Sequence, residues 1–123
     1  MTKRWEDNVP SALRAKGVRL VDAPSSEVAW PPEHMPQLIA WLADNGYGVL
    51  GGDFYDRKGK DFLPTYTTWY SDIKKGEAWA AYSQRSCDEA LERTEKMKKD
   101  KCWVVIVASL KPTAEQLVTR HAR

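Results

Sequence analysis

The sequence is poor in the residues that most often carry catalytic and metal chemistry. It contains only two histidines, His34 and His121, and two cysteines, Cys87 and Cys102. A metal cage or a catalytic dyad built on histidine is therefore not expected, and two widely spaced cysteines are too few for a disulfide framework. We expect both thiols to be reduced and to pack as small apolar side chains, and we expect no cofactor.

Long hydrophobic runs are also missing. The longest apolar run, residues 102–108, suits a buried strand and falls far short of the roughly 20 residues that a membrane span needs. The first residues, MTKRWEDNVP, are not followed by an apolar segment of the kind found in signal peptides. We therefore expect a cytoplasmic protein with no membrane contact.

An excess of charge of one sign is absent as well. The 19 basic and 17 acidic residues give a net charge of +2 and are interleaved along the chain. A nucleic-acid-binding domain usually carries a basic stripe on one face, so we expect no nucleic-acid partner. The length of 123 residues is typical of one compact domain, and we expect residues 1–123 to form a single one.

Tryptophan, by contrast, is abundant, with six in the chain. Large side chains fill the core of a small domain, but exposed tryptophans also serve as anchors in recognition surfaces. We expect Trp79 and Trp103 to lie in the core, and we regard Trp69 as the best candidate for an exposed anchor.

The spacing of apolar residues predicts an α+β domain. We expect a mainly antiparallel sheet with a central β-hairpin and with helices packed on one face. The helices are recognised by apolar residues that recur every three or four positions, and the last strand is apolar on both faces, as an interior strand is. The expected order is a helix at 8–17, a strand at 18–21, a loop at 22–32, a helix that starts near Pro32 and ends at Gly46, a hairpin within 48–70, a helix at 77–99, a strand at 102–110 and a terminal helix at 113–123.

The hairpin contains the most unusual stretch, GVLGGDFYDRKGKDFLPTYTTWYSD at residues 48–72. Gly51–Tyr55 and Thr65–Tyr70 alternate between two faces, and the second segment is rich in residues that favour strands. The Gly51-Gly52 pair indicates a β-bulge or a close approach of two backbones. Asp53 then has two interpretations: its carboxylate accepts backbone N–H groups at the bulge, or it belongs to a recognition surface.

An enzymatic alternative also fits this stretch. Some metal-dependent nucleases bind Mg²⁺ through an aspartate on one strand and an Asp-x-Lys on the next, and Asp53 with Asp72-Ile73-Lys74 resembles that spacing. Lys74, however, lies past the end of the expected strand, and Asp-x-Lys is common by chance. We therefore predict a protein with no catalytic residues and no metal site, and keep a nuclease as the alternative.

Three short motifs follow one another in an order that is typical of one family. They are Gly51-Gly52-Asp53-Phe54-Tyr55, then Thr65-Tyr66-Thr67-Thr68-Trp69-Tyr70, then a helix that contains Trp79, Tyr82, Arg85-Ser86 and Ala90. In this succession the chain resembles, over about residues 38–110, the Immunity protein 40 family of bacterial polymorphic toxin systems.

The resemblance implies a non-enzymatic protein that binds and neutralises a cognate toxin, and so protects the cell that makes both. Asp53, Tyr55, Trp69 and Tyr70 match the family pattern and are the candidate partner-binding residues. Aromatic side chains are favoured anchors at interfaces, and an acidic rim steers a basic partner. Whether Trp69 is such an anchor or a part of the core stays open at this level.

Overall fold

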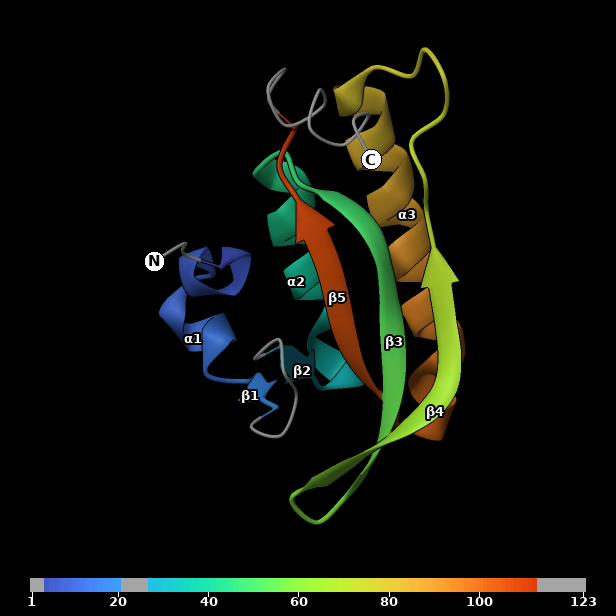
Figure 1. The fold of residues 1–123 in the computed structure, drawn as a ribbon. Coiled ribbons are helices and arrows are strands. Elements are labelled where there is room, and N and C mark those ends of the chain that lie inside the picture. Colours follow the sequence, from blue (N-terminus) through green and yellow to red (C-terminus); the bar gives the residue numbers. More distant parts are fainter. Residues whose placement is uncertain (1–3, 21–26, 113–123) are drawn as a thin grey trace, which may run out of the picture.

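The structure, a computed structural model, describes residues 4–20 and 27–112, which form one α+β domain (Figure 1). Five strands make an antiparallel sheet in the order β1-β2-β5-β3-β4. Two main helices pack against this sheet and lie behind it in Figure 1. The elements are η1 (Trp5–Asn8), α1 (Ser11–Arg14), β1 (Val18–Arg19), β2 (Val28–Trp30), η2 (Pro32–His34), α2 (Met35–Asp44), β3 (Gly48–Lys58), β4 (Asp61–Tyr70), α3 (Trp79–Met97), η3 (Lys98–Asp100) and β5 (Trp103–Ser109).

The predicted central hairpin is confirmed. β3 pairs with β4 from Gly51 opposite Tyr70 to Lys58 opposite Asp61. The strands run further than the sequence indicates, so that only two residues remain for the turn. Gly59 in this turn has φ +63°, a conformation that glycine adopts without steric cost.

The helix α2 shows how local sequence determines an element. Its apolar stripe is formed by Met35, Leu38, Ile39 and Leu42, all of which are buried against α3 and the sheet, as their helical spacing predicts. Gly46 follows the helix with φ +78°, the left-handed conformation that ends many helices.

The region before α2 differs from the expectation. The expected helix at 8–17 consists of two short pieces, η1 and α1, and the expected strand at 18–21 is reduced to β1. The expected loop contains the strand β2, whose three residues are all buried and which lies between β1 and β5 in the sheet. Its sequence, Val-Ala-Trp beside two prolines, is too short to show a period of two, so only the pairing with β5 reveals the strand.

The strand β3 approaches its neighbours so closely that side chains are excluded at Gly48 and Gly52. A Cβ at Gly48 would lie 2.5 Å from the ring of Tyr82, and one at Gly52 would lie 2.3 Å from the ring of Trp69. The register with β5 also shifts between Val49 and Gly51. The bulge and the close approach that the Gly-Gly pair indicates are therefore both present.

The positions of the tryptophans correct the sequence-based expectation. Trp69 is only 3 % exposed and belongs to the core, whereas Trp79 and Trp103, expected in the core, are half-buried. The reason is that Trp69 occupies the space left by Gly52 on the adjacent strand. The alternation of side chains between the two faces of β4 does not indicate which face the helices cover.

Cys87 and Cys102 are both free thiols and both buried, as expected for small core side chains. Burial raises the pKa of the Cys87 thiol to about 11, so it is protonated at neutral pH. The expected terminal helix at 113–123 lies outside the described residues. Within the described ranges, no helix combines the length and the apolar character that crossing a membrane requires.

Candidate functional site

The pairing register places some hairpin residues toward the helices. Gly52 lies opposite Trp69, and the rings of Phe54 and Trp69 are 5.4 Å apart. Phe54 and Trp69 are both buried in the hydrophobic core. These residues therefore form the inner face of the hairpin.

The alternate residues form the opposite face, which no described helix covers and which is toward the viewer in Figure 1. Asp53 and Tyr55 alternate with Phe54 along β3, and Tyr70 lies opposite Gly51. Tyr70 is 77 % exposed, while Asp53 and Tyr55 are half-buried. We call this surface the open face; the register assigns to it Asp53, Tyr55, Thr68, Tyr70, Trp103, Val105 and Val107, of which Val105 is buried.

The carboxylate of Asp53 accepts no hydrogen bond and joins no ion pair within the described part of the chain. The backbone groups at the bulge have other partners. The N–H of Val49 donates to Oγ of Ser86 at 3.0 Å, and the hydroxyl of Thr68 donates to the carbonyl of Gly52 at 2.7 Å. The interpretation of Asp53 as an acceptor for bulge N–H groups is therefore wrong.

The carboxylates of Asp53 and Glu27 act on the hydroxyl of Tyr55 at the open face. Its pKa is raised, mainly because burial disfavours the phenolate and further because of the charges of Asp53 and Glu27. A phenol that stays protonated beside a carboxylate can donate a hydrogen bond, while the carboxylate attracts a basic group.

A cation–aromatic cluster that the sequence does not reveal lies at the hairpin end of the open face. The guanidinium of Arg57 lies 4.6 Å from the ring centre of Trp103 and 5.1 Å from that of Phe62. The two rings meet edge to face at 5.4 Å. The signal in the sequence is weak, because Trp103 is far from the hairpin and only the pairing of Tyr55 with Trp103 brings it there.

The loop between β4 and α3 is held by Arg85. Its guanidinium makes two hydrogen bonds of 2.8 Å to the carboxylate of Glu77 and one of 2.8 Å to the carbonyl of Asp72. Bidentate pairs of this kind are among the stronger polar contacts in proteins. Arg85 therefore fixes the path of the chain between the hairpin and α3.

The pair formed by Glu77 and Arg85 predicts a pH dependence of stability. The hydrogen bonds from Arg85, and then the one from the N–H of Lys74, lower the pKa of Glu77 from 4.5 to about 2. Because the folded-state pKa is the lower one, the stabilisation is complete above pH 4.5 and is lost as the pH falls toward 2. The wild type should therefore melt at a higher temperature than Glu77→Gln at neutral pH, and the difference should shrink between these two pH values. Thermal unfolding of both proteins across the acidic range tests this, and an unchanged difference at low pH would contradict it.

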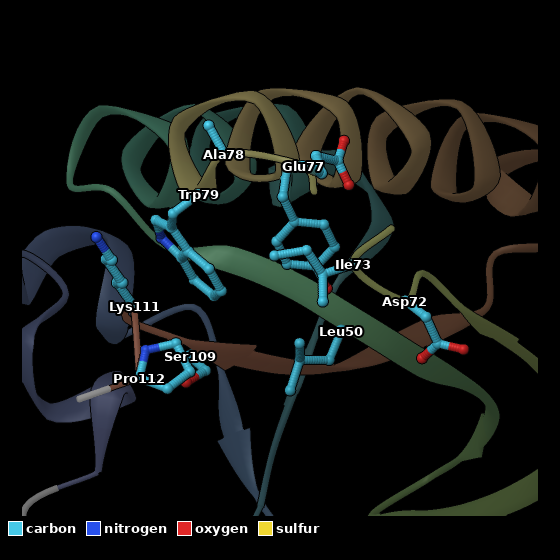
Figure 2. Close-up of a pocket in the computed structure, with 10 residues that line it drawn as sticks. Leu50, Asp72, Ile73, Glu77, Ala78, Trp79, Ser109, Lys111 and Pro112 are labelled. Carbon is cyan, nitrogen blue, oxygen red and sulfur yellow. The ribbon is translucent and has the colours of Figure 1, made fainter. Parts of the chain in front are cut away.

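Beside this loop lies a pocket of about 390 Å³ with a mainly apolar lining (Figure 2). Figure 2 shows Leu50 of β3, Ile73 of the loop, Trp79 of α3 and Pro112 around it. The indole N–H of Trp79 donates to the carbonyl of Gly46 at 2.9 Å, which fixes that wall. This pocket is lined largely by the loop and by α3, so it is separate from the open face.

The arrangement expected for a nuclease is not formed. Asp72 and Lys74 lie in the irregular segment after β4 rather than on a strand. Over residues 4–20 and 27–112, no group of three or more histidines, cysteines, aspartates or glutamates could hold a metal ion. Asp53 thus belongs to no such group among the described residues.

These features define a small α+β protein with a covered inner sheet face and an open face that carries aromatic and acidic side chains. The family model described as Immunity protein 40 matches residues 13–108. The chain therefore belongs to the Immunity protein 40 family, whose members are typically non-enzymatic inhibitors. The match begins well before the residues that carry the resemblance in the sequence. Neither the curated proteins nor the solved structures include a significant match to this chain.

Six of the motif residues fall into two groups in the structure. Gly52, Trp69 and Ser86 pack inside the protein or satisfy its backbone. Asp53, Tyr55 and Tyr70 lie on the open face. Family membership implies toxin neutralisation. Of these six residues Tyr70 is the most exposed, and Asp53 and Tyr55 are half-buried.

Proposed function

We propose that this protein binds the cognate toxin through the open face and so neutralises it in the cytoplasm of the producing cell. Asp53, Tyr55 and Tyr70 contact the toxin in this proposal. Trp69 supports them from the inner face and does not contact the partner, because its side chain is buried.

The observation that carries the proposal is the position of Asp53. Its carboxylate is paired with no group in the described ranges, although it lies on a sheet in a protein whose family acts by binding. An unpaired carboxylate beside aromatic side chains contributes nothing evident to folding, but it suits recognition of a basic protein surface.

The test uses the toxin domain encoded by the neighbouring reading frame. We expect Asp53→Asn to slow association with this domain by about three- to tenfold at low salt, and to reduce the salt dependence of the rate. The melting temperature should not change, because the carboxylate makes no hydrogen bond within the described residues. Association rates from surface plasmon resonance and thermal unfolding measure the two quantities.

The matched control is Asp44→Asn, an exposed aspartate at the end of α2, in the helical layer. It removes the same charge from the opposite side of the sheet, so it should affect association only slightly. Equal effects of the two substitutions would reject the open face as the contact surface. Absence of binding by the wild type would reject the proposed function itself.

A further inference from the structure

The strand β4 contains a large bulge at residues 65–67, within the second of the three motifs. Asp53 pairs with Thr68 and Tyr55 pairs with Pro64, so residues 65–67 all lie opposite Phe54. The hydroxyl of Thr65 donates to the carbonyl of Phe54 at 2.8 Å and accepts from the N–H of Thr67 at 3.1 Å. A side chain thus replaces the missing backbone partner, and the bulge is a built feature of the strand.

Tyr66, in the middle of this bulge, has φ +64°. The left-handed conformation is unfavourable for residues with a Cβ, and glycine or asparagine adopts it at a lower cost. Lys101 is the other described non-glycine residue with a positive φ. It lies in the turn that ends η3, where this conformation is common. A tyrosine at position 66 is therefore a poor choice for stability alone.

The ring of Tyr66 makes no stabilising contact with the described part of the protein. It is 89 % exposed, the highest value among the large hydrophobic residues of the described chain, and Tyr70 follows at 77 %. Among the described residues, the ring makes no aromatic contact and its hydroxyl makes no hydrogen bond. Backbone strain that carries no benefit for the fold is typical of functional positions.

The surroundings of Tyr66 suit side-chain contact rather than addition of a partner strand. β4 lies at the edge of the described sheet, and residues 62–71 include no charged side chain. Pro64 lacks a backbone N–H, and the bulge interrupts the row of backbone groups two residues later. The edge therefore offers exposed rings but no regular hydrogen-bonding ladder.

The charges beside this edge indicate the chemistry of the partner. Tyr66 lies in the bulge between Pro64 and Thr68, the partners of Tyr55 and Asp53, so its position along the strand falls between those of two open-face residues. Asp53, whose partner Thr68 follows Tyr66 by two residues, forms no ion pair with any described residue. An aromatic anchor with an unpaired carboxylate nearby complements an apolar pocket with a basic rim.

We infer that Tyr66 is an anchor residue, held in a strained bulge, that inserts into an apolar, basic-rimmed pocket of the cognate toxin. This inference rests on the proposed function. It predicts two opposite effects of substituting Tyr66 by asparagine. Binding of the partner should weaken, while the stability of the protein alone should rise, because the backbone strain at this position is relieved.

The test compares four substitutions at Tyr66, with binding to the toxin domain of the neighbouring reading frame and thermal unfolding as readouts. Tyr66→Asn and Tyr66→Gly relieve the backbone and remove the ring. We expect Tyr66→Asn to raise the melting temperature by about 3 °C and both variants to weaken binding by about tenfold or more. Tyr66→Ala removes the ring without relieving the backbone, so binding should weaken with no gain in stability. Tyr66→Phe should retain most of both properties.

Leu91→Ala is the control, since it removes another exposed apolar side chain, 40 % exposed on α3, and should leave binding unchanged. Unchanged binding by Tyr66→Asn and Tyr66→Ala, with a wild type that binds, would overturn the inference and leave the proposed function intact. A wild type that does not bind would overturn both. Concentration-dependent dimers in sedimentation, lost in Tyr66→Ala, would assign the anchor to a second copy of this chain and overturn the assignment to the toxin.

Discussion

Replacing Trp69 by alanine is expected to lower the free energy of unfolding by about 3–5 kcal/mol. The indole is 3 % exposed, packs against the ring of Phe54 at 5.4 Å and fills the space above Gly52. Its removal leaves a cavity between β4 and the helices that these rigid neighbours cannot close. Urea unfolding followed by circular dichroism measures the change.

Tyr70→Ala is the matched control, because it truncates the next aromatic residue on the same strand. Tyr70 is 77 % exposed on the open face, so the stability should change by no more than about 0.5 kcal/mol. Under the proposed function, Tyr70→Ala should weaken toxin binding, whereas Trp69→Ala should reduce protection only in step with the folded fraction. Strong destabilisation by Tyr70→Ala, or a loss of binding by folded Trp69→Ala, would contradict this division of the two faces.

A milder substitution refines the first result. The indole N–H of Trp69 is buried and has no hydrogen-bond partner among the described residues. Trp69→Phe removes this unsatisfied donor while it keeps an aromatic ring, so part of the packing loss is offset. We therefore expect Trp69→Phe to be clearly more stable than Trp69→Ala.

Substituting Gly52 by alanine is expected to destabilise the protein by about 3 kcal/mol. The added Cβ would lie 2.3 and 2.5 Å from two ring atoms of Trp69 and 2.8 Å from the carbonyl oxygen of Val105. Both neighbours are fixed, one by the core and the other by the backbone of β5. Chemical unfolding of the variant gives the loss directly.

A double-mutant cycle identifies the cause of this loss. In the Gly52→Ala background, Trp69→Leu should cost much less than it costs in the wild type, because the smaller side chain makes room for the new methyl group. The rescue should be partial, since the contact with the carbonyl of Val105 remains. Additive effects would show that the clash with the indole is not the source.

The two groups of motif residues explain why resemblance alone could not locate the interface. Gly52 and Trp69 are complementary in size within one hairpin. The hydroxyl of Ser86 on α3 accepts a hydrogen bond from the N–H of Val49 at the bulge of β3. These residues specify the hairpin and its contact with α3. The open face is a consequence of that scaffold, because it places Asp53 and Tyr55 on the side that the helices leave uncovered.

Local patterns were sufficient for the α+β class, for the hairpin and for the core stripe of α2. Helical spacing and alternation arise from backbone geometry, so they are visible wherever an element is long enough. The Gly-Gly pair likewise indicated a bulge or a close backbone approach. The strand β2 was missed because its three residues carry no period, and its formation depends on pairing with β5, more than seventy residues later.

The sequence by itself determined the family, the hairpin and the set of residues from which the site is drawn. Only the tertiary structure decided which of them face outward. Trp69 and Tyr70 are adjacent, similar in size and equally suited to a strand, yet one is buried and the other is exposed. The difference arises because α2 and α3 cover a single face of the sheet, and a residue's face is set by pairing register across distant strands rather than by its own chemistry.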